Sequence, residues 1–211
     1  MERVDSIIFD LDGTMWDTRE EIAEIWSDAF KGYGLDIVVT KEIISSLMGL
    51  RYDEAIKKMT PMVPEEKREE IIRDQVGFEA ERILERKGGI VFDDVEDVLI
   101  ELSKKYKLFI VSNCQVGYIE SFLEINNFEK YFIDFENAER TGLDKWENNK
   151  LIIERNDLKN PVYIGDTLGD ALSAEKAGIP FIYASYGFGD VEKYDRRIDK
   201  FKDLIELDIL K

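Results

Sequence analysis

Acidic and polar side chains directly follow three short apolar stretches of the 211-residue chain. The stretches are residues 7–9, 109–111 and 162–164, and each is typical of a buried strand. The polar residues that follow them are Asp10 and Asp12, Ser112 and Asn113, and Asp166 and Asp170. In open α/β sheets the ligand crevice lies outside the carboxyl ends of the strands. If the three stretches are neighbouring strands, one site therefore receives all six side chains.

The four carboxyl groups of this expected site indicate a metal. Like charges at close range raise one another's pKa values, so four carboxylates do not all stay ionised unaided, and a bound divalent cation resolves the conflict. The chain has no His and one Cys. The available ligands are therefore carboxylate and backbone oxygens, which select a hard cation. We expect Mg2+ beside Asp10, Asp12, Asp166 and Asp170.

The composition excludes several classes of function. Without His, neither a Ser-His-Asp nor a Cys-His mechanism is available, and a single Cys forms no disulfide within the chain. The formal net charge of −17 argues against binding to nucleic acid or to anionic membrane surfaces. No apolar stretch approaches the length of a membrane span, and none has the character of a secretory signal, so we expect a cytoplasmic protein. The charge favours solubility and leaves monomer and homodimer both open.

The elements that must position these residues fall into two kinds. After residue 94, strand and helix patterns alternate, which predicts a parallel sheet with helices on both faces. The expected strands are Val4–Phe9, Leu108–Val111, Ile133–Glu136, Val162–Ile164 and Phe181–Ala184. The last expected helix covers residues 200–207.

Residues 15–88, by contrast, have a wholly helical pattern. The first helix is expected to begin at Thr18, which forms a capping-box pattern with Glu21. Further helices are expected from Thr40, over Tyr52–Met59, and as one long helix over residues 65–87. This block follows the first strand and therefore reads as an insertion into the α/β fold.

Three of these segments resemble the motifs of a known family. Asp10-Leu11-Asp12-Gly13-Thr14, Val111-Ser112-Asn113 and residues 165–170 (Gly-Asp-Thr-Leu-Gly-Asp) are similar to the first, second and fourth motifs of the haloacid dehalogenase-like (HAD) hydrolase superfamily. The helical block resembles the cap of the subgroup that includes phosphoglycolate phosphatases and β-phosphoglucomutases. The resemblance implies a three-layer, Rossmann-like parallel sheet core of residues 1–14 and 89–211, with an inserted all-helical cap of residues 15–88.

The resemblance also implies a role for each motif residue. Asp10 would be the nucleophile that forms an aspartyl-phosphate, and Asp12 the general acid and base. Mg2+ would bind a carboxylate oxygen of Asp10, the backbone carbonyl of Asp12 and a carboxylate oxygen of Asp166, while Asp170 would orient metal-bound waters. Ser112 and Asn113 would hydrogen-bond the transferring phosphoryl group.

The third motif of the family is a Lys, commonly followed by Pro, and this chain has no Lys-Pro. Lys145 precedes the helix expected over residues 146–155 and is preferred for this role, whereas Lys150 lies inside that helix and is the alternative. Arg51, in the cap, is expected to contact the leaving group of the substrate. Thr18 is explained by helix capping, so no catalytic role is assigned to it.

The sequence thus predicts a Mg2+-dependent phosphatase that acts on a small phosphorylated metabolite. A phosphomutase or an inorganic pyrophosphatase could use the same core. A non-catalytic phospho-ligand-binding module is the alternative from another class, although such a module has no need of Asp12. Dehalogenation is disfavoured, because that branch of the family lacks the second acid of the first motif.

Overall fold

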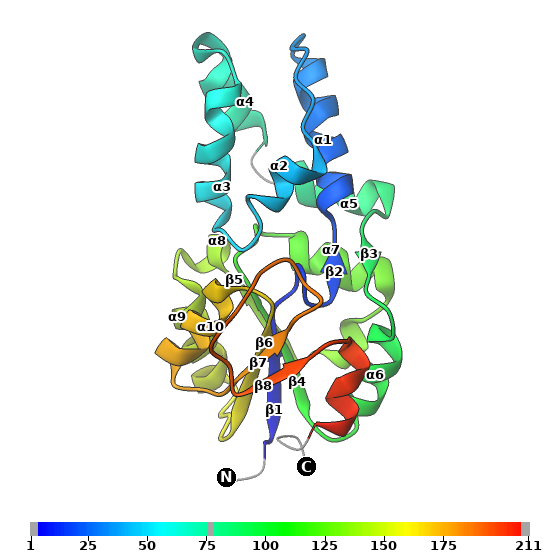
Figure 1. Ribbon diagram of the computed structural model, residues 1–211. Coiled ribbons are helices and arrows are strands. Elements are labelled where there is room, and N and C mark those ends of the chain that lie inside the picture. The colour runs from blue at the N-terminus through cyan, green and yellow to red at the C-terminus, as the bar shows by residue number, and fades with distance from the viewer. Residues whose placement is uncertain (1–3, 76–77, 208–211) are drawn as a thin grey trace.

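The computed structural model describes residues 4–75 and 78–207 and is built on a six-stranded sheet (Figure 1). All paired neighbours are parallel, and the strand order is β5-β4-β1-β6-β7-β8. The strands are β1 (Ser6–Phe9), β4 (Lys107–Ser112), β5 (Asp134–Asn137), β6 (Pro161–Gly165), β7 (Phe181–Ala184) and β8 (Arg196–Ile198). The predicted parallel α/β sheet is therefore confirmed, and β1 lies between the two strands that carry the other motif residues.

The pairing register places the carboxyl ends of these three strands side by side. Phe9 of β1 pairs with Ile110 of β4 on one side and with Ile164 of β6 on the other. Asp10 therefore leaves the sheet beside the last residues of β4 and β6, which end at Ser112 and Gly165. The three strands are almost continuously apolar and buried, which is typical of parallel strands covered on both faces.

Helices cover both faces of the sheet and complete three layers. Ile7 and Phe9 point into a core formed with one set of helices, and Ile8 points into a second core on the opposite face. The first set is α6 (Val95–Ser103), α7 (Tyr118–Asn126) and the 3-10 helix η4 (Phe201–Glu206); the second is α9 (Lys145–Arg155) and α10 (Leu168–Ala177). Two short helical turns, η3 (Glu129–Tyr131) and α8 (Ala138–Thr141), flank β5.

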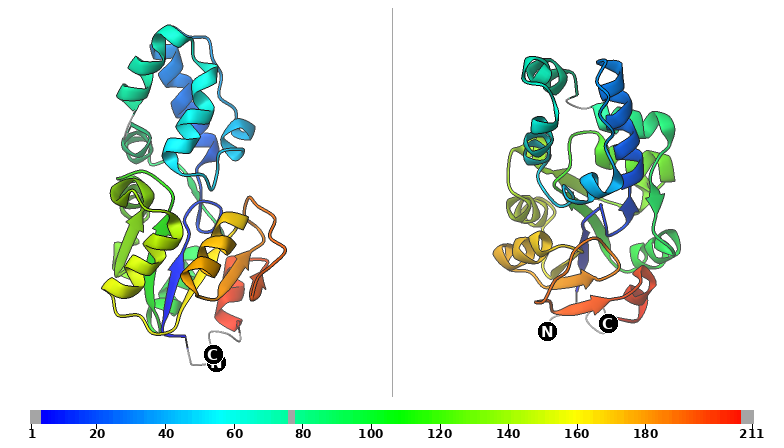
Figure 2. Two further views of the ribbon diagram at one scale, coloured as in Figure 1. Left: turned by 90° about the vertical axis from the view of Figure 1, so that its left-hand side faces the viewer. Right: turned by 45° about the horizontal axis from the view of Figure 1, so that its top comes forward.

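The helical block stands beyond the carboxyl ends of the strands (Figures 1 and 2). Its elements are α1 (Arg19–Gly32), α2 (Lys41–Ser45), α3 (Tyr52–Met59), η1 (Thr60–Met62), η2 (Glu65–Lys67), α4 (Arg68–Gln75) and α5 (Phe78–Arg86). The chain enters and leaves the block through two short antiparallel strands, β2 (Trp16–Asp17) and β3 (Ile90–Val91). The helical block is thus connected to the rest of the chain by two neighbouring segments, β2 and β3.

Some predicted elements were wrong in detail. Residues 65–87 are not one helix, because they divide into η2, α4 and α5, and α4 and α5 occupy different places in Figure 1. Val76, which helped to suggest the continuous helix, lies outside the described residues. The last predicted helix is the 3-10 helix η4. Strands β2, β3 and β8 have two or three residues each and are too short for an alternating pattern.

Among residues 4–75 and 78–207, no helix combines the length and the apolar character needed to cross a membrane.

Candidate active site

Three of the predicted carboxylates converge beside the end of β1. Asp10 directly follows β1, Asp166 directly follows β6, and Asp170 lies in the first turn of α10. Each offers an oxygen within 4.8 Å of the oxygens of the other two, and all three side chains are buried. The strand register described above brings them together, because β1 and β6 end at the same edge of the sheet.

Lys145, the first residue of α9, supplies the positive charge at this point. Its Nζ donates to Asp10 Oδ1 over 2.7 Å and to Asp170 Oδ1 over 2.6 Å, and the residue is only 6% exposed. Lys150 is exposed, and its Nζ lies 5.0 Å from the centroid of the Trp146 ring. The geometry therefore favours Lys145 over Lys150 for the third-motif role.

One ammonium among three buried carboxylates leaves the cluster short of positive charge. Burial raises the pKa of Asp10 to about 7, aided by the charge of Asp170 and opposed by Lys145. Burial, with the charges of Asp170 and Asp10, also raises the pKa of Asp166 well above its usual value. For Asp170 burial also acts to raise the pKa, but the charge and hydrogen bond of Lys145, together with the hydrogen bonds from Thr167, outweigh burial and the pKa is lowered. The pKa of Lys145 is raised, because Asp10 and Asp170 outweigh the opposing effect of its burial.

The unsatisfied atoms of the cluster fit a hard divalent cation. Asp166 Oδ1 is buried and, within the described structure, has no hydrogen-bond partner, whereas Oδ2 accepts from the Phe188 N–H over 2.6 Å. The turn after β1 leaves just enough room for this carboxylate, since Gly13 has φ of +80° and a Cβ there would lie 2.1 Å from Asp166 Oδ2. A donor set made only of carboxylate oxygens suits Mg2+.

Asp12 lies on the other side of Asp10 and has its own hydrogen-bond donors. Its Oδ1 accepts from the Tyr118 hydroxyl over 2.7 Å and from the Thr18 hydroxyl over 3.2 Å. The two hydroxyl oxygens are themselves 2.6 Å apart. Burial raises the pKa of Asp12 to about 6, although both hydroxyl groups act against this rise. A carboxyl with a pKa near neutrality suits a group that must both give and take a proton.

The explanation of Thr18 as a capping residue was incomplete. Thr18 does occupy the N-cap position of α1, but its side chain makes no cap hydrogen bond and instead faces Asp12. Its backbone ψ of 3° is not the extended conformation of a usual N-cap. Tyr118 was missed altogether, because it lies 106 residues from Asp12 in the chain and carries no local signal.

Replacing Tyr118 with phenylalanine is expected to lower kcat about tenfold, the usual effect of losing one hydrogen bond to a charged group. Because the hydroxyl stabilises the Asp12 carboxylate, its removal raises the pKa of Asp12. If Asp12 is the general acid, the basic limb of the pH–rate profile, where this proton is lost, moves to higher pH. A pH series of kcat for both proteins tests this. Tyr131→Phe, at a tyrosine remote from the site, is the control. An unshifted profile would mean that Tyr118 does not tune Asp12.

Ser112 and Asn113 end β4 at the same edge, and Asn113 also contacts the helical block. The Asn113 Nδ2 donates to the Gly49 carbonyl over 2.9 Å, and the Asn113 carbonyl accepts from the Tyr52 N–H over 3.3 Å. Ser112 is 3% exposed and lines the same cavity as Asp10 and Asp12. The second motif is thus tied by hydrogen bonds to the segment between α2 and α3.

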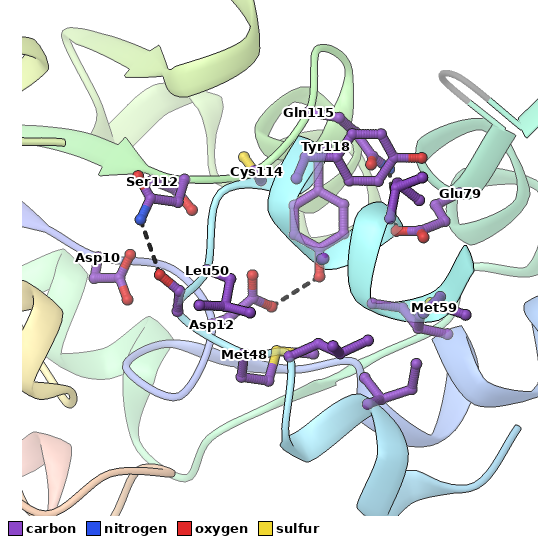
Figure 3. Close-up of a pocket in the computed structure, with 18 of the residues that line it drawn as sticks. Asp10, Asp12, Met48, Leu50, Met59, Glu79, Ser112, Cys114, Gln115 and Tyr118 are labelled. Atoms are coloured by element: carbon purple, nitrogen blue, oxygen red, sulfur yellow. Dashed lines mark hydrogen bonds between the residues drawn. The ribbon is translucent and has the colours of Figure 1, made fainter. Parts of the chain in front are cut away.

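A cavity of about 660 Å³, including its opening, lies between the sheet edge and the block (Figure 3). At the sheet end it is lined by the motif residues Asp10, Asp12, Ser112, Asn113 and Lys145. On the block side most lining residues are apolar: Ile22, Trp26, Ile44, Leu47, Met48, Leu50, Ala55, Ile56 and Met59. The polar remainder at that side includes Glu79 and Gln115.

Arg51 does not line this cavity. Its Nη1 donates to the Leu143 carbonyl over 3.0 Å and lies 3.3 Å from Asp144 Oδ1. It borders a second, shallower opening on the outer side of Asn113 and Lys145. In this structure Arg51 therefore links the helical block to the loop before α9, and its contact with a leaving group stays a prediction.

Comparison with known proteins agrees with this geometry. The family model described as haloacid dehalogenase-like hydrolase matches residues 7–184. A phosphoglycolate phosphatase from Photobacterium profundum is 24% identical over 226 residues, covering 98% of this chain and 96% of that protein. Pyrophosphatase PpaX from Listeria monocytogenes is 28% identical over 131 residues, covering 62% of this chain and 58% of that protein.

The fold has close counterparts among solved structures. A predicted phosphoglycolate phosphatase from Haemophilus somnus superposes with a TM-score of 0.84 at 20% identity, covering 98% of each chain. At that identity the likeness shows the fold. The family match over residues 7–184, by contrast, takes in most of the sequence and each motif whose side chains meet at the sheet edge. This chain accordingly belongs to the haloacid dehalogenase-like hydrolases.

Proposed function

We propose that this hydrolase is a Mg2+-dependent phosphatase that cleaves a small phosphorylated metabolite through an aspartyl-phosphate on Asp10. The observation that supports this most strongly is the position of Asp10. Its carboxylate is held by Lys145, lies within 4.8 Å of the Asp166 and Asp170 ligand atoms, and lines the same cavity as Asp12. Phosphatases are also among its relatives of similar length.

The reaction proceeds in two displacements at phosphorus. A carboxylate oxygen of Asp10 attacks phosphorus, the bond from phosphorus to the ester oxygen breaks, and Asp12 gives its proton to the departing alcohol. Asp12, now a carboxylate, takes a proton from water as the water oxygen attacks the aspartyl-phosphate. The bond between phosphorus and Asp10 breaks, phosphate leaves, and both carboxyl groups regain their starting states.

Asp10, Asp166 and the backbone carbonyl of Asp12 would hold Mg2+, with Asp170 orienting the cluster. When bound, the ion supplies positive charge against the developing negative charge of phosphoryl transfer. Lys145 adds a second positive charge beside the nucleophile. The Ser112 hydroxyl would donate to a phosphoryl oxygen. The Asn113 amide has two N–H groups, of which Gly49 takes one, so the other serves the same purpose.

We further propose that residues 15–88 act as the cap over a core of residues 1–14 and 89–211. The helices α1 to α5 stand over the carboxyl edge of the sheet (Figure 2). Of these, α1, α2, α3 and the loop between α2 and α3 supply the apolar side of the cavity. Hydrogen bonds from Asn113 and Arg51 hold the two parts together in this structure. A cap in this position excludes water from the transfer step and selects the leaving group.

The covalent intermediate provides the direct test. Wild-type protein is mixed with an aryl phosphate, quenched in acid within one turnover, and examined by intact and peptide mass spectrometry. We expect a phosphoryl group on the peptide that contains Asp10 when Mg2+ is present, and none when EDTA replaces it. A phosphoryl group on a different peptide, or turnover without any covalent species, would contradict the proposal.

A further inference from the structure

The side chains that line the cavity do not suit a leaving group that carries a negative charge. Of the described residues that line it, Lys145 alone is basic, and Asp10 and Asp170 already engage its ammonium. Phosphoglycolate carries a carboxylate beyond its ester oxygen, and pyrophosphate carries a second phosphate. Such a group would enter a largely apolar space that offers it no cation. Burying an unpaired charge is costly, so the cavity disfavours both.

The far end of the cavity carries an acidic group of its own. Glu79 on α5 is 7% exposed, lines the cavity, and lies across the drawn pocket from Asp10, with Asp12 and Tyr118 between them (Figure 3). Its carboxylate accepts from the Trp26 Nε1–H and, over 3.4 Å, from the Gln115 amide. Both donors are neutral. Burial, together with the charge of Asp12, raises the pKa of Glu79 to about 7 against the effect of these two donors.

An acceptor beside Glu79 lacks a donor. Gln115 is 1% exposed and lines the same cavity, and within the described chain its Oε1 has no hydrogen-bond partner. A buried acceptor without a donor is unfavourable, and a native structure normally satisfies it. The Glu79 carboxyl, which has only neutral donors, and the unpartnered Gln115 Oε1 therefore lie together at one end of a largely apolar cavity. A ligand with several N–H donors and a positive charge would suit both.

We infer, on the basis of the phosphatase function proposed above, that the substrate is a phosphate monoester of an apolar amino alcohol whose protonated amine binds Glu79 and Gln115. The phosphate lies at Asp10, the apolar body lies against Ile22, Leu47, Ile56 and Met59, and the ammonium lies at the far end. An ammonium has three N–H donors and neutralises the buried carboxylate. The apolar part of the leaving group thus contacts apolar side chains, and its ammonium contacts the acidic end of the cavity.

The test compares three homologous series of phosphate monoesters: aminoalkyl, n-alkyl and carboxyalkyl phosphates of increasing chain length. For wild-type protein with Mg2+ we expect the best aminoalkyl ester to exceed the alkyl ester of the same length by about tenfold in kcat/KM, a modest value for one charged hydrogen-bonded contact. Carboxyalkyl esters should be the poorest. In Glu79→Gln the ratio of kcat/KM between the aminoalkyl ester and the alkyl ester of the same length should fall to about one.

Glu81→Gln is the matched control, because Glu81 is an exposed acid on the same helix. This variant should retain the preference for the amine. Alkyl or carboxyalkyl esters that match the amines in wild type would overturn the inference, and so would a Glu79→Gln protein that keeps the amine preference. If Glu79→Gln fails to fold, the wild-type comparison alone decides. Absence of a phospho-enzyme with every ester would instead refute the proposed function itself.

Discussion

Replacing Asp10 with asparagine is expected to lower kcat for phosphate release by at least about 10⁴-fold, since nucleophile substitutions in enzymes with covalent intermediates have effects of this order or larger. Asparagine keeps the shape of the side chain and can still accept the hydrogen bond from Lys145, but its amide oxygen is a poor nucleophile. Steady-state phosphate release with Mg2+ measures the effect. Turnover at the wild-type rate in purified Asp10→Asn would assign the chemistry to another residue.

The same variant should be more stable than wild type without metal. Burial raises the pKa of Asp10 from 3.8 to about 7, so the folded state binds this proton more tightly than the unfolded state does. Wild-type stability then falls as pH rises from about 4 through 7, because the buried carboxyl loses its proton over that range. Asparagine does not titrate. In EDTA at about pH 8, chemical denaturation should give Asp10→Asn a higher free energy of unfolding than wild type. This difference in stability should shrink toward about pH 4. A pH-independent difference would contradict this.

Replacing Lys145 with methionine is expected to lower both activity and stability. The substitution leaves Asp10, Asp166 and Asp170 buried together without the ammonium that joins two of them. Removing one partner from a buried ion pair typically costs about 3–5 kcal/mol, and losing charge stabilisation of this kind lowers kcat by about 10²- to 10³-fold. Chemical denaturation and phosphate release at neutral pH measure the two effects.

Lys150→Met is the matched control for this variant. Lys150 is exposed on the same helix and lies over the Trp146 ring, so its loss should change stability by no more than about 0.5 kcal/mol. Added Mg2+ should restore part of the stability of Lys145→Met, because the ion returns positive charge to the three carboxylates. Equal effects of the two substitutions on stability and activity would contradict the proposed role of Lys145.

The sheet and most of the acidic cluster could be predicted because their signals are local. A buried parallel strand is a short apolar run, and a functional side chain at its end is a polar residue that stops the run. Asp10, Ser112 and Asp166 all follow this pattern, and the register of β1 with its neighbours brings them together. Lys145 was preferred over Lys150 from the family resemblance together with its place before the expected helix. These features depend on residues that are close in the sequence.

The partners of the cluster could not be predicted in this way, because they depend on tertiary packing. Tyr118 reaches Asp12 across 106 positions, and Thr18 looked locally like an ordinary helix cap. Glu79 falls within a helix whose charged residues mostly face solvent, and nothing in its neighbourhood marks it as buried. The division between α4 and α5, by contrast, has a local signal that the prediction of one long helix passed over, because Gly77, a poor helix former, stands between them in the sequence.

The pairing of β2 with β3 brings the two ends of the helical block together, with Trp16 opposite Val91. The block can therefore lengthen, shorten or be replaced as a cassette, because any segment with closely spaced ends can be spliced between these strands without altering the register of the sheet. If the block selects the leaving group and Asp10 is the nucleophile, as proposed, the two properties can change independently. A chimera that carries the block of another family member on this sheet is then expected to keep the chemistry at Asp10 and to acquire the other protein's substrate preference.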